Sequence, residues 1–194
     1  GHRLACVESP LPQGAENLAG VIIPRKTVTE IRKLLDDSSV ENVTVSMSDN
    51  KVRFTLEDVT LTSKLIDGTY PDYERVIPTD NDKNLELKVK ELASAVDRVS
   101  VVAERTRAIK VVTGPNKATI ITSSPDLGSA SEEIEAKYDN DVLEIGYNFR
   151  YLLDILNEVK GDTVRISFTD GTSPSVIHDT SDSSAIYVLM PMRV

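Results

Sequence analysis

The stretch "VIIPRKTVTEIRKLLDD", residues 21–37, decides how the chain can fold. Four of its apolar residues recur at the spacing of one face of an α-helix: Val28, Ile31, Leu34 and Leu35. Pro24 suits the first turn of that helix, because its missing N–H would have no intrahelical partner there. The apolar residues 21–23 before it favour a short strand. The stretch therefore predicts a strand that leads directly into a helix.

The same pattern occurs twice more, in "NLELKVKELASAVDRVSVVAE" (84–104) and "VLEIGYNFRYLLDILNEVK" (142–160). The apolar stripes of these two predicted helices are Leu92, Val96 and Val99, and Leu152, Ile155, Leu156 and Val159. After each helix, apolar and polar residues alternate as in strands, with turn residues at Asp49-Asn50, Gly114-Pro115-Asn116 and Asp170-Gly171. The period is about 60 residues, so each unit is predicted to be βαβββ and the fold to be α+β.

Three such units do not divide evenly into domains of two units each. We expect the last two units to form one complete domain, residues 73–194, and residues 1–72 to be half of another. The partner half of that first domain is expected before Gly1, and the chain, which has no initiator Met, is expected to be a fragment. The stretch "GTYPDYERVIPTDNDKN", with two prolines, has the composition of a linker between the domains.

Composition restricts the class of protein. The 194 residues carry 22 basic and 31 acidic side chains, a net charge of −9, and no Trp, so the core is expected to be aliphatic. The single Cys6 excludes an internal disulfide framework and favours a reducing compartment, and no Cys/His cluster suggests zinc. No apolar run approaches the roughly 18 residues of a membrane span. Such acidity argues against a broad nucleic-acid-binding face, but not against a local basic strip.

Basic residues nevertheless gather on the polar faces of the predicted helices. They are Arg25, Lys26, Arg32, Lys33, Lys90, Arg98, Arg105 and Arg150. Acidic residues concentrate in the strands and loops. One interpretation is ordinary solvated helix faces, and the other is a sequence-independent surface for phosphates. No aromatic residue lies among the basic positions, which argues against stacking on unpaired bases.

The sequence predicts no catalytic, metal or cofactor site. His2 and His178 lie in no recognised motif, and we expect His178 to face solvent on a strand. Cys6 is expected in the core and not as a nucleophile. Glu132 and Glu133 are adjacent in a strand, so their side chains should point to opposite faces and cannot act as an acid/base pair.

Five motifs resemble the bacterial replicative sliding clamp, the beta subunit of DNA polymerase III. They are "GHRLA", "PRK" opening a helix, "TSKLIDGTYPDYERVIP", "LEIGYNFRYLLDIL" and the terminal "YVLMPMRV". The resemblance implies a clamp fold in which helices on one face of the sheets line a channel around duplex DNA. Residues 1–72 would be the second half of the middle domain and residues 73–194 the C-terminal domain. The basic helix residues named above would then face DNA.

The resemblance also implies a hydrophobic cleft that binds short peptide motifs of the polymerase, the clamp loader and repair proteins. Position by position, the cleft would use Gly1, His2, Arg3, Leu4, Pro71, Arg75, Val76, Asn148, Tyr151, Val188, Leu189, Met190, Pro191, Met192, Arg193 and Val194. Methionine side chains adapt to different partners, which suits the wall of such a cleft. Two positions depart from the family pattern, Thr106 and Pro174, and both could alter the pocket.

The function implied is that of a non-enzymatic processivity factor in the cytoplasm, associated with the nucleoid. Its full-length form would be a head-to-tail homodimeric ring without cofactors. Because ring closure uses the family's N-terminal domain, we do not expect this chain alone to form the ring. Two alternatives remain: a docking module of the same fold that does not encircle DNA, and a hydrolase or nuclease with an unrecognised site.

Overall fold

The computed structural model describes residues 1–37, 41–103 and 106–194. It contains two compact units, one of residues 1–9 and 73–194 and the other of residues 10–72. Each unit is described separately below. No helix among the described residues is long and apolar enough to cross a membrane.

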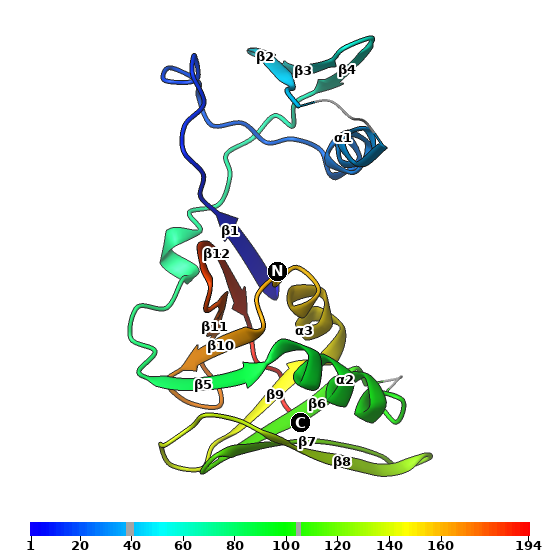
Figure 1. The fold of residues 1–194 in the computed structure, drawn as a ribbon, viewed down its shortest axis with the longest axis vertical. Coiled ribbons are helices and arrows are strands. Elements are labelled where there is room, and N and C mark those ends of the chain that lie inside the picture. Colours follow the sequence, from blue (N-terminus) through cyan, green and yellow to red (C-terminus); the bar gives the residue numbers. More distant parts are fainter. Residues whose placement is uncertain (38–40, 104–105) are drawn as a thin grey trace. The chain divides into compact units, whose positions relative to one another are not determined.

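The larger unit contains two antiparallel sheets and two helices (Figure 1). The first sheet has the order β1-β12-β11-β10-β5, with bounds Arg3–Val7, Asp182–Leu189, Ser175–Asp179, Thr163–Phe168 and Lys83–Lys88. The second has the order β8-β7-β6-β9, with bounds Gly128–Glu135, Lys117–Ser124, Ala108–Gly114 and Glu144–Asn148. The helices are α2 (Val89–Ser100) and α3 (Phe149–Leu156), and a short 3₁₀ helix, η1, covers Glu74–Val76.

The two predicted βαβββ units are confirmed in this part of the chain, as β5-α2-β6-β7-β8 and β9-α3-β10-β11-β12. The apolar stripes face the core: Leu92, Val96 and Val99 of α2 and Leu152, Ile155 and Leu156 of α3 are buried. Each such side chain contributes about 1.5–3 kcal/mol through burial. The helices contact each other, and α2 also packs on both sheets. The helices and the two sheets therefore share one core, which is mainly aliphatic but includes the buried rings of Tyr147 and Phe168.

The smaller unit contains α1 (Arg25–Asp37) and the sheet β2-β3-β4, with bounds Thr44–Ser48, Lys51–Leu56 and Val59–Lys64. Its core is small and consists of Ile31, Val52, Phe54 and Leu56. Helix α1 begins at Arg25, directly after Pro24 and close to the predicted start, but its buried face differs from the prediction. Val28 and Leu35 are 50% and 42% exposed, whereas Thr27 is buried. The Thr27 hydroxyl hydrogen-bonds Ser63 at 2.7 Å, which satisfies its polar atom in the interior.

Residues 21–23, which were predicted to form a strand, do not form one. The carbonyl oxygen of Ile22 accepts one backbone hydrogen bond, from the N–H of Ile66 at 2.9 Å. The strand that precedes α1 in the chain is instead β1, whose five residues pair with β12. Apolarity alone could not distinguish the two segments, because strand formation requires a neighbouring edge with free backbone groups. As a result, residues 1–9 belong by their contacts to the larger unit.

Candidate functional site

The C-terminal tail, residues 190–194, leaves one sheet and reaches the other. Strand β12 ends at Leu189, and the next N–H, of Met190, donates to the carbonyl oxygen of His2 at 3.0 Å. Pro191 has no N–H to continue the ladder. The N–H of Met192 then donates to the carbonyl oxygen of Gly146 on β9 at 2.9 Å. The tail therefore runs from the end of β12, an inner strand of one sheet, to β9, an edge strand of the other.

Strand β1 places the predicted N-terminal cleft residues beside the predicted C-terminal ones. Arg3 is opposite Leu189, and Leu4 is opposite Val188. The guanidinium carbon of Arg3 lies 4.4 Å from the centre of the Tyr151 ring, and the same side chain forms an ion pair with Asp154. These contacts hold β1 against α3.

Asn148 orients the start of α3. Its side-chain oxygen accepts hydrogen bonds from the N–H groups of Arg150 and Tyr151, at 3.1 and 3.4 Å. This is an N-cap arrangement, which satisfies helix donors that would otherwise have no partner. Asn148 therefore fixes the start of α3, where Tyr151 lies.

The remaining predicted cleft residues differ in exposure. Met190 is 40% exposed and Val194 57%, whereas Val188 and Leu189 are buried. Gly1, His2, Arg75, Val76 and Arg193 are exposed, and Pro191 and Met192 are half-buried. Arg75 and Val76 lie on η1. Pro71 falls in the other compact unit.

A hollow of about 430 Å³ lies beside the tail. It is lined by Thr106, Ala108, Lys110, Ile121, Thr122, Ser123, Glu144, Met192, Arg193 and Val194. Thr106, one of the two positions expected to depart from the family pattern, thus lies at this hollow. Pro174 is not among the lining residues, and its carbonyl oxygen accepts a hydrogen bond from Asn81 at 3.1 Å.

The basic helix residues are exposed, but several have acidic partners. Arg98 donates two hydrogen bonds to Glu132 on β8, and this contact lowers the pKa of Glu132. On α1, Lys33 lies 3.3 Å from Glu30, and Arg32 lies 3.9 Å from Asp36. The other predicted DNA-facing residues are exposed, namely Arg25, Lys26, Lys90 and Arg150, while Arg105 lies outside the described residues. The effective positive charge is therefore lower than the number of Lys and Arg residues suggests.

The residues considered for catalysis lie apart. Glu132 and Glu133 point to opposite faces as predicted, since Glu132 bonds Arg98 and Glu133 bonds Lys117 at 2.7 Å. His178 was expected to face solvent but is half-buried. Burial and the nearby Arg165 lower its pKa. Cys6 was expected in the core but is only half-buried. Among the described residues, no cluster of three or more His, Cys, Asp or Glu side chains could hold a metal ion.

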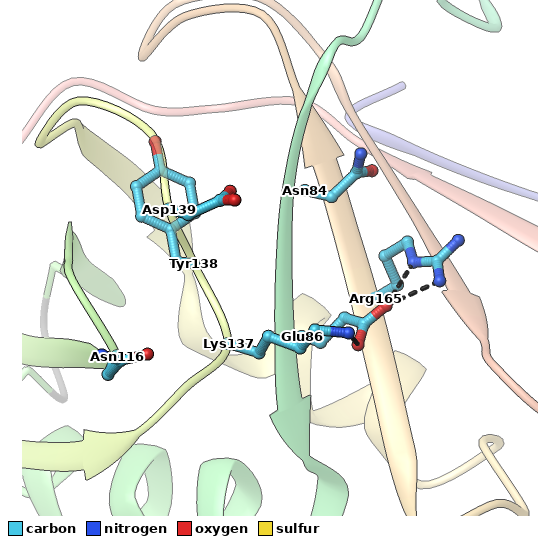
Figure 2. A pocket seen from close by; sticks show the side chains of 7 residues that line it. All are labelled: Asn84, Glu86, Asn116, Lys137, Tyr138, Asp139 and Arg165. Atoms are coloured by element: carbon cyan, nitrogen blue, oxygen red, sulfur yellow. Dashed lines mark hydrogen bonds and ion pairs between the residues drawn. The ribbon is translucent and has the colours of Figure 1, made fainter.

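Figure 2 shows a second hollow, of about 480 Å³, that sequence reasoning missed. Glu86 accepts two hydrogen bonds from Arg165, at 2.9 and 2.6 Å, and one from Lys137 at 3.3 Å. The Arg165 contact is the main cause of a lowered Glu86 pKa. Glu86 and Lys137 also form an isolated backbone bridge, so the cluster joins β5 to the chain that leaves β8. None of the predicted site residues lines this hollow.

The comparisons with known proteins cover the whole chain. Residues 1–72 match the model of the DNA polymerase III beta subunit, central domain, and residues 74–193 that of its C-terminal domain. A beta sliding clamp of Caulobacter vibrioides is 46% identical over 195 residues, and one of Escherichia coli 37%; both alignments cover 100% of this chain. The chain spans 52% and 53% of those relatives, about half of their length.

Solved structures agree with this result. A Bartonella birtlesii sliding clamp bound to griselimycin matches with a TM-score of 0.95 at 42% identity, and Caulobacter crescentus pol III beta with 0.93 at 44%. Both matches cover 100% of this chain and 52% of the solved one. The predicted α+β clamp fold is therefore confirmed. The chain belongs to the family of DNA polymerase III beta subunits, the beta sliding clamps.

Proposed function

We propose that this chain is the partner-docking part of a replication processivity clamp. The observation that carries the proposal is the tail with the exposed Met190 and the half-buried Met192, held between β1 and β9 in a chain that matches beta sliding clamps along its whole length. Apolar side chains that remain exposed beside Arg3 and Arg193 suit short peptides with large apolar residues. The residues that form this site suit binding and not bond cleavage, so the part played is accessory, not enzymatic.

The clamp that contains this segment encircles duplex DNA without reading its sequence. Support comes from the exposed cations of α1 and α2, since Lys and Arg near phosphates release counterions and allow sliding contacts. Residues 1–72 are the second half of a middle domain and residues 73–194 a C-terminal domain, in line with the two family models. Such a clamp works on chromosomal DNA in the cytoplasm.

Ring closure by a head-to-tail homodimer needs a free surface on the C-terminal domain, and β8 supplies a suitable edge. The strand pairs only with β7 among the described strands. It carries three glutamates, Glu132, Glu133 and Glu135, and the exposed Leu127 directly precedes it in the chain. An open edge with acidic side chains favours a partner strand with basic ones. The opposing strand would belong to the N-terminal domain of the partner subunit.

A topological experiment separates encircling from simple adhesion. A full-length clamp that carries this segment should be retained on nicked circular DNA and released when the circle is cut. A ring is linked to a closed circle by topology and slides off only where the DNA has an end. Binding that ignores linearisation would contradict encircling and favour a docking module of the same fold. The cleft is tested separately by titrating this chain with griselimycin, the compound bound to the Bartonella birtlesii relative.

A further inference from the structure

The last three residues of the chain depend on one contact with β9. Pro191 cannot donate a hydrogen bond, so the bond from Met192 N–H to the Gly146 carbonyl oxygen is the first backbone anchor after Met190. Strand β9 is an edge strand of its sheet, paired with β6 on its other side. The position of the tail therefore depends on how closely it can approach β9 at Gly146.

Gly146 allows this approach because it has no side chain. A Cβ atom built there would lie 2.1 Å from the carbonyl oxygen of Met192, and 2.8 and 2.9 Å from the γ-carbons of Val194. All three nearest atoms belong to the tail, so an added methyl group would push on the tail and not on the core. Because one of them is a backbone oxygen, no rotamer change relieves the overlap, and the tail would move by roughly 1 Å to restore van der Waals contact.

Space, not backbone conformation, is what requires glycine at this position. The φ angle of Gly146 lies outside the left-handed region, so any L-residue could adopt its backbone conformation. Gly114, on the neighbouring strand β6, provides a comparison. A Cβ there would meet its nearest atom, the γ-carbon of the Lys117 side chain, at 3.6 Å, which is an ordinary van der Waals distance.

We propose that Gly146 is a positioning residue of the peptide-binding cleft. Its bare Cα seats the C-terminal tail on β9 and so holds Met190 and Met192 where a bound peptide meets them. The inference rests on the proposed cleft and adds to it a residue that touches no ligand itself. Displacement of about 1 Å at a binding wall is enough to remove most of the shape complementarity on which affinity depends.

The test compares Gly146→Ala with the matched control Gly114→Ala in this 194-residue chain. Amide hydrogen exchange, followed by NMR, reports the Met192 N–H directly, and calorimetry with griselimycin reports the cleft. In Gly146→Ala, Met192 should exchange about tenfold faster or more, and griselimycin should bind about tenfold more weakly. In Gly114→Ala, both measurements should match the unmodified chain.

Each result decides a separate question. Unchanged exchange at Met192 in Gly146→Ala, or faster exchange with unchanged affinity, would overturn the inference. If Gly146→Ala also lowers the melting temperature, the substitution is repeated in a chain that ends at Pro191. In that shortened chain, Gly146→Ala should not change the melting temperature. A decrease that remains would show that Gly146 serves the stability of the sheet and not the position of the tail. If the unmodified chain binds no griselimycin, the proposed cleft fails, and the exchange result still decides whether Gly146 seats the tail.

Discussion

The guanidinium carbon of Arg3 lies 4.4 Å from the centre of the Tyr151 ring, so the first strand of the chain is held against the start of its last helix. Asp154, one turn further along the helix, forms an ion pair with the same arginine. The side chains of Arg3 and Asp154 are 42% and 59% exposed. Solvent screens such a pair, so the contact serves to orient Tyr151 more than to stabilise the fold.

This arrangement predicts a small change in stability and a larger change in binding. Arg3→Ala should lower the free energy of unfolding by less than about 1 kcal/mol, because exposed ion pairs and cation–π contacts contribute little. Griselimycin affinity should fall about threefold to tenfold. Arg3→Lys should restore part of it, since a lysine can still pair with Asp154 but stacks less well on the ring. Equal calorimetric affinities for all three proteins would contradict the assignment of Arg3 to the cleft.

The tail itself is the most direct target. Met190→Ala or Arg193→Ala should weaken peptide-ligand binding without unfolding the domain, because both side chains are exposed and contribute little to the core. The matched control is Leu127→Ala, which removes another exposed apolar side chain at the turn between β7 and β8. Affinity and melting temperature are measured on the same samples. If Met190→Ala and Leu127→Ala bind griselimycin equally well, the tail is not part of the binding wall.

Ion pairing predicts that two basic residues of α2 contribute unequally to DNA binding. Arg98 is already bonded to Glu132, whereas Lys90 is exposed at the start of the helix. In a full-length clamp, Lys90→Ala should reduce the slope of log affinity against log salt by about 0.9 for each phosphate that the lysine neutralises. Arg98→Ala should change the slope less. Retention on circular duplex DNA is measured across a salt series, and a larger effect of Arg98→Ala would refute this ranking.

A buried hydrogen bond joins the two sheets of the larger unit close to the tail. The hydroxyl groups of Tyr147 and Ser175 are 2.6 Å apart, both residues are almost fully buried, and burial raises the pKa of Tyr147. Tyr147→Phe would leave the Ser175 hydroxyl without this partner and should lower the free energy of unfolding by about 1–3 kcal/mol. Adding Ser175→Ala should recover part of this stability. Urea denaturation of the two single variants and the double variant measures the coupling, and strict additivity would argue against the bond.

Asp170 predicts a pH dependence of stability. Its carboxylate accepts hydrogen bonds from the N–H and hydroxyl groups of Thr172 and Ser173, at 2.6 to 2.9 Å, which lowers its pKa to about 2. The pKa of Asp170 in the folded state lies below its unfolded value of about 3.9. The stabilisation that the ionised carboxylate gives to the fold is therefore complete above about pH 3.9 and disappears as the pH falls toward about 2.

Asp170→Asn should therefore cost on the order of 1–2 kcal/mol at neutral pH, and the difference from the unmodified chain should shrink between about pH 4 and pH 2. Asp141→Asn, at an exposed position between strands, serves as the control. Unfolding free energies from urea titrations at several pH values give the comparison. A difference that stays constant down to about pH 2 would show that the carboxylate is not preferentially stabilised in the folded state.

Local sequence patterns determined most of the secondary structure. The stripe of Leu92, Val96 and Val99 and the turn at Gly114-Pro115-Asn116 lie where the pattern placed them, because helix period and turn chemistry are properties of a few neighbouring residues. The repeat of about 60 residues indicated the βαβββ units, and five short motifs indicated the family. The residues proposed for the cleft came from that resemblance and remain a prediction.

Only the tertiary structure decided which segments meet. Nothing in a period-two pattern says that β1 pairs with β12, that the tail crosses to Gly146, or that Arg98 bonds Glu132. The apolar residues 21–23 could have formed a strand, but Ile23 instead packs on the core of the smaller unit, and Val28 could have been buried but is 50% exposed. Pairing of strands and charges is decided by long-range geometry, since an edge or a carboxylate selects its partner by position and not by sequence distance.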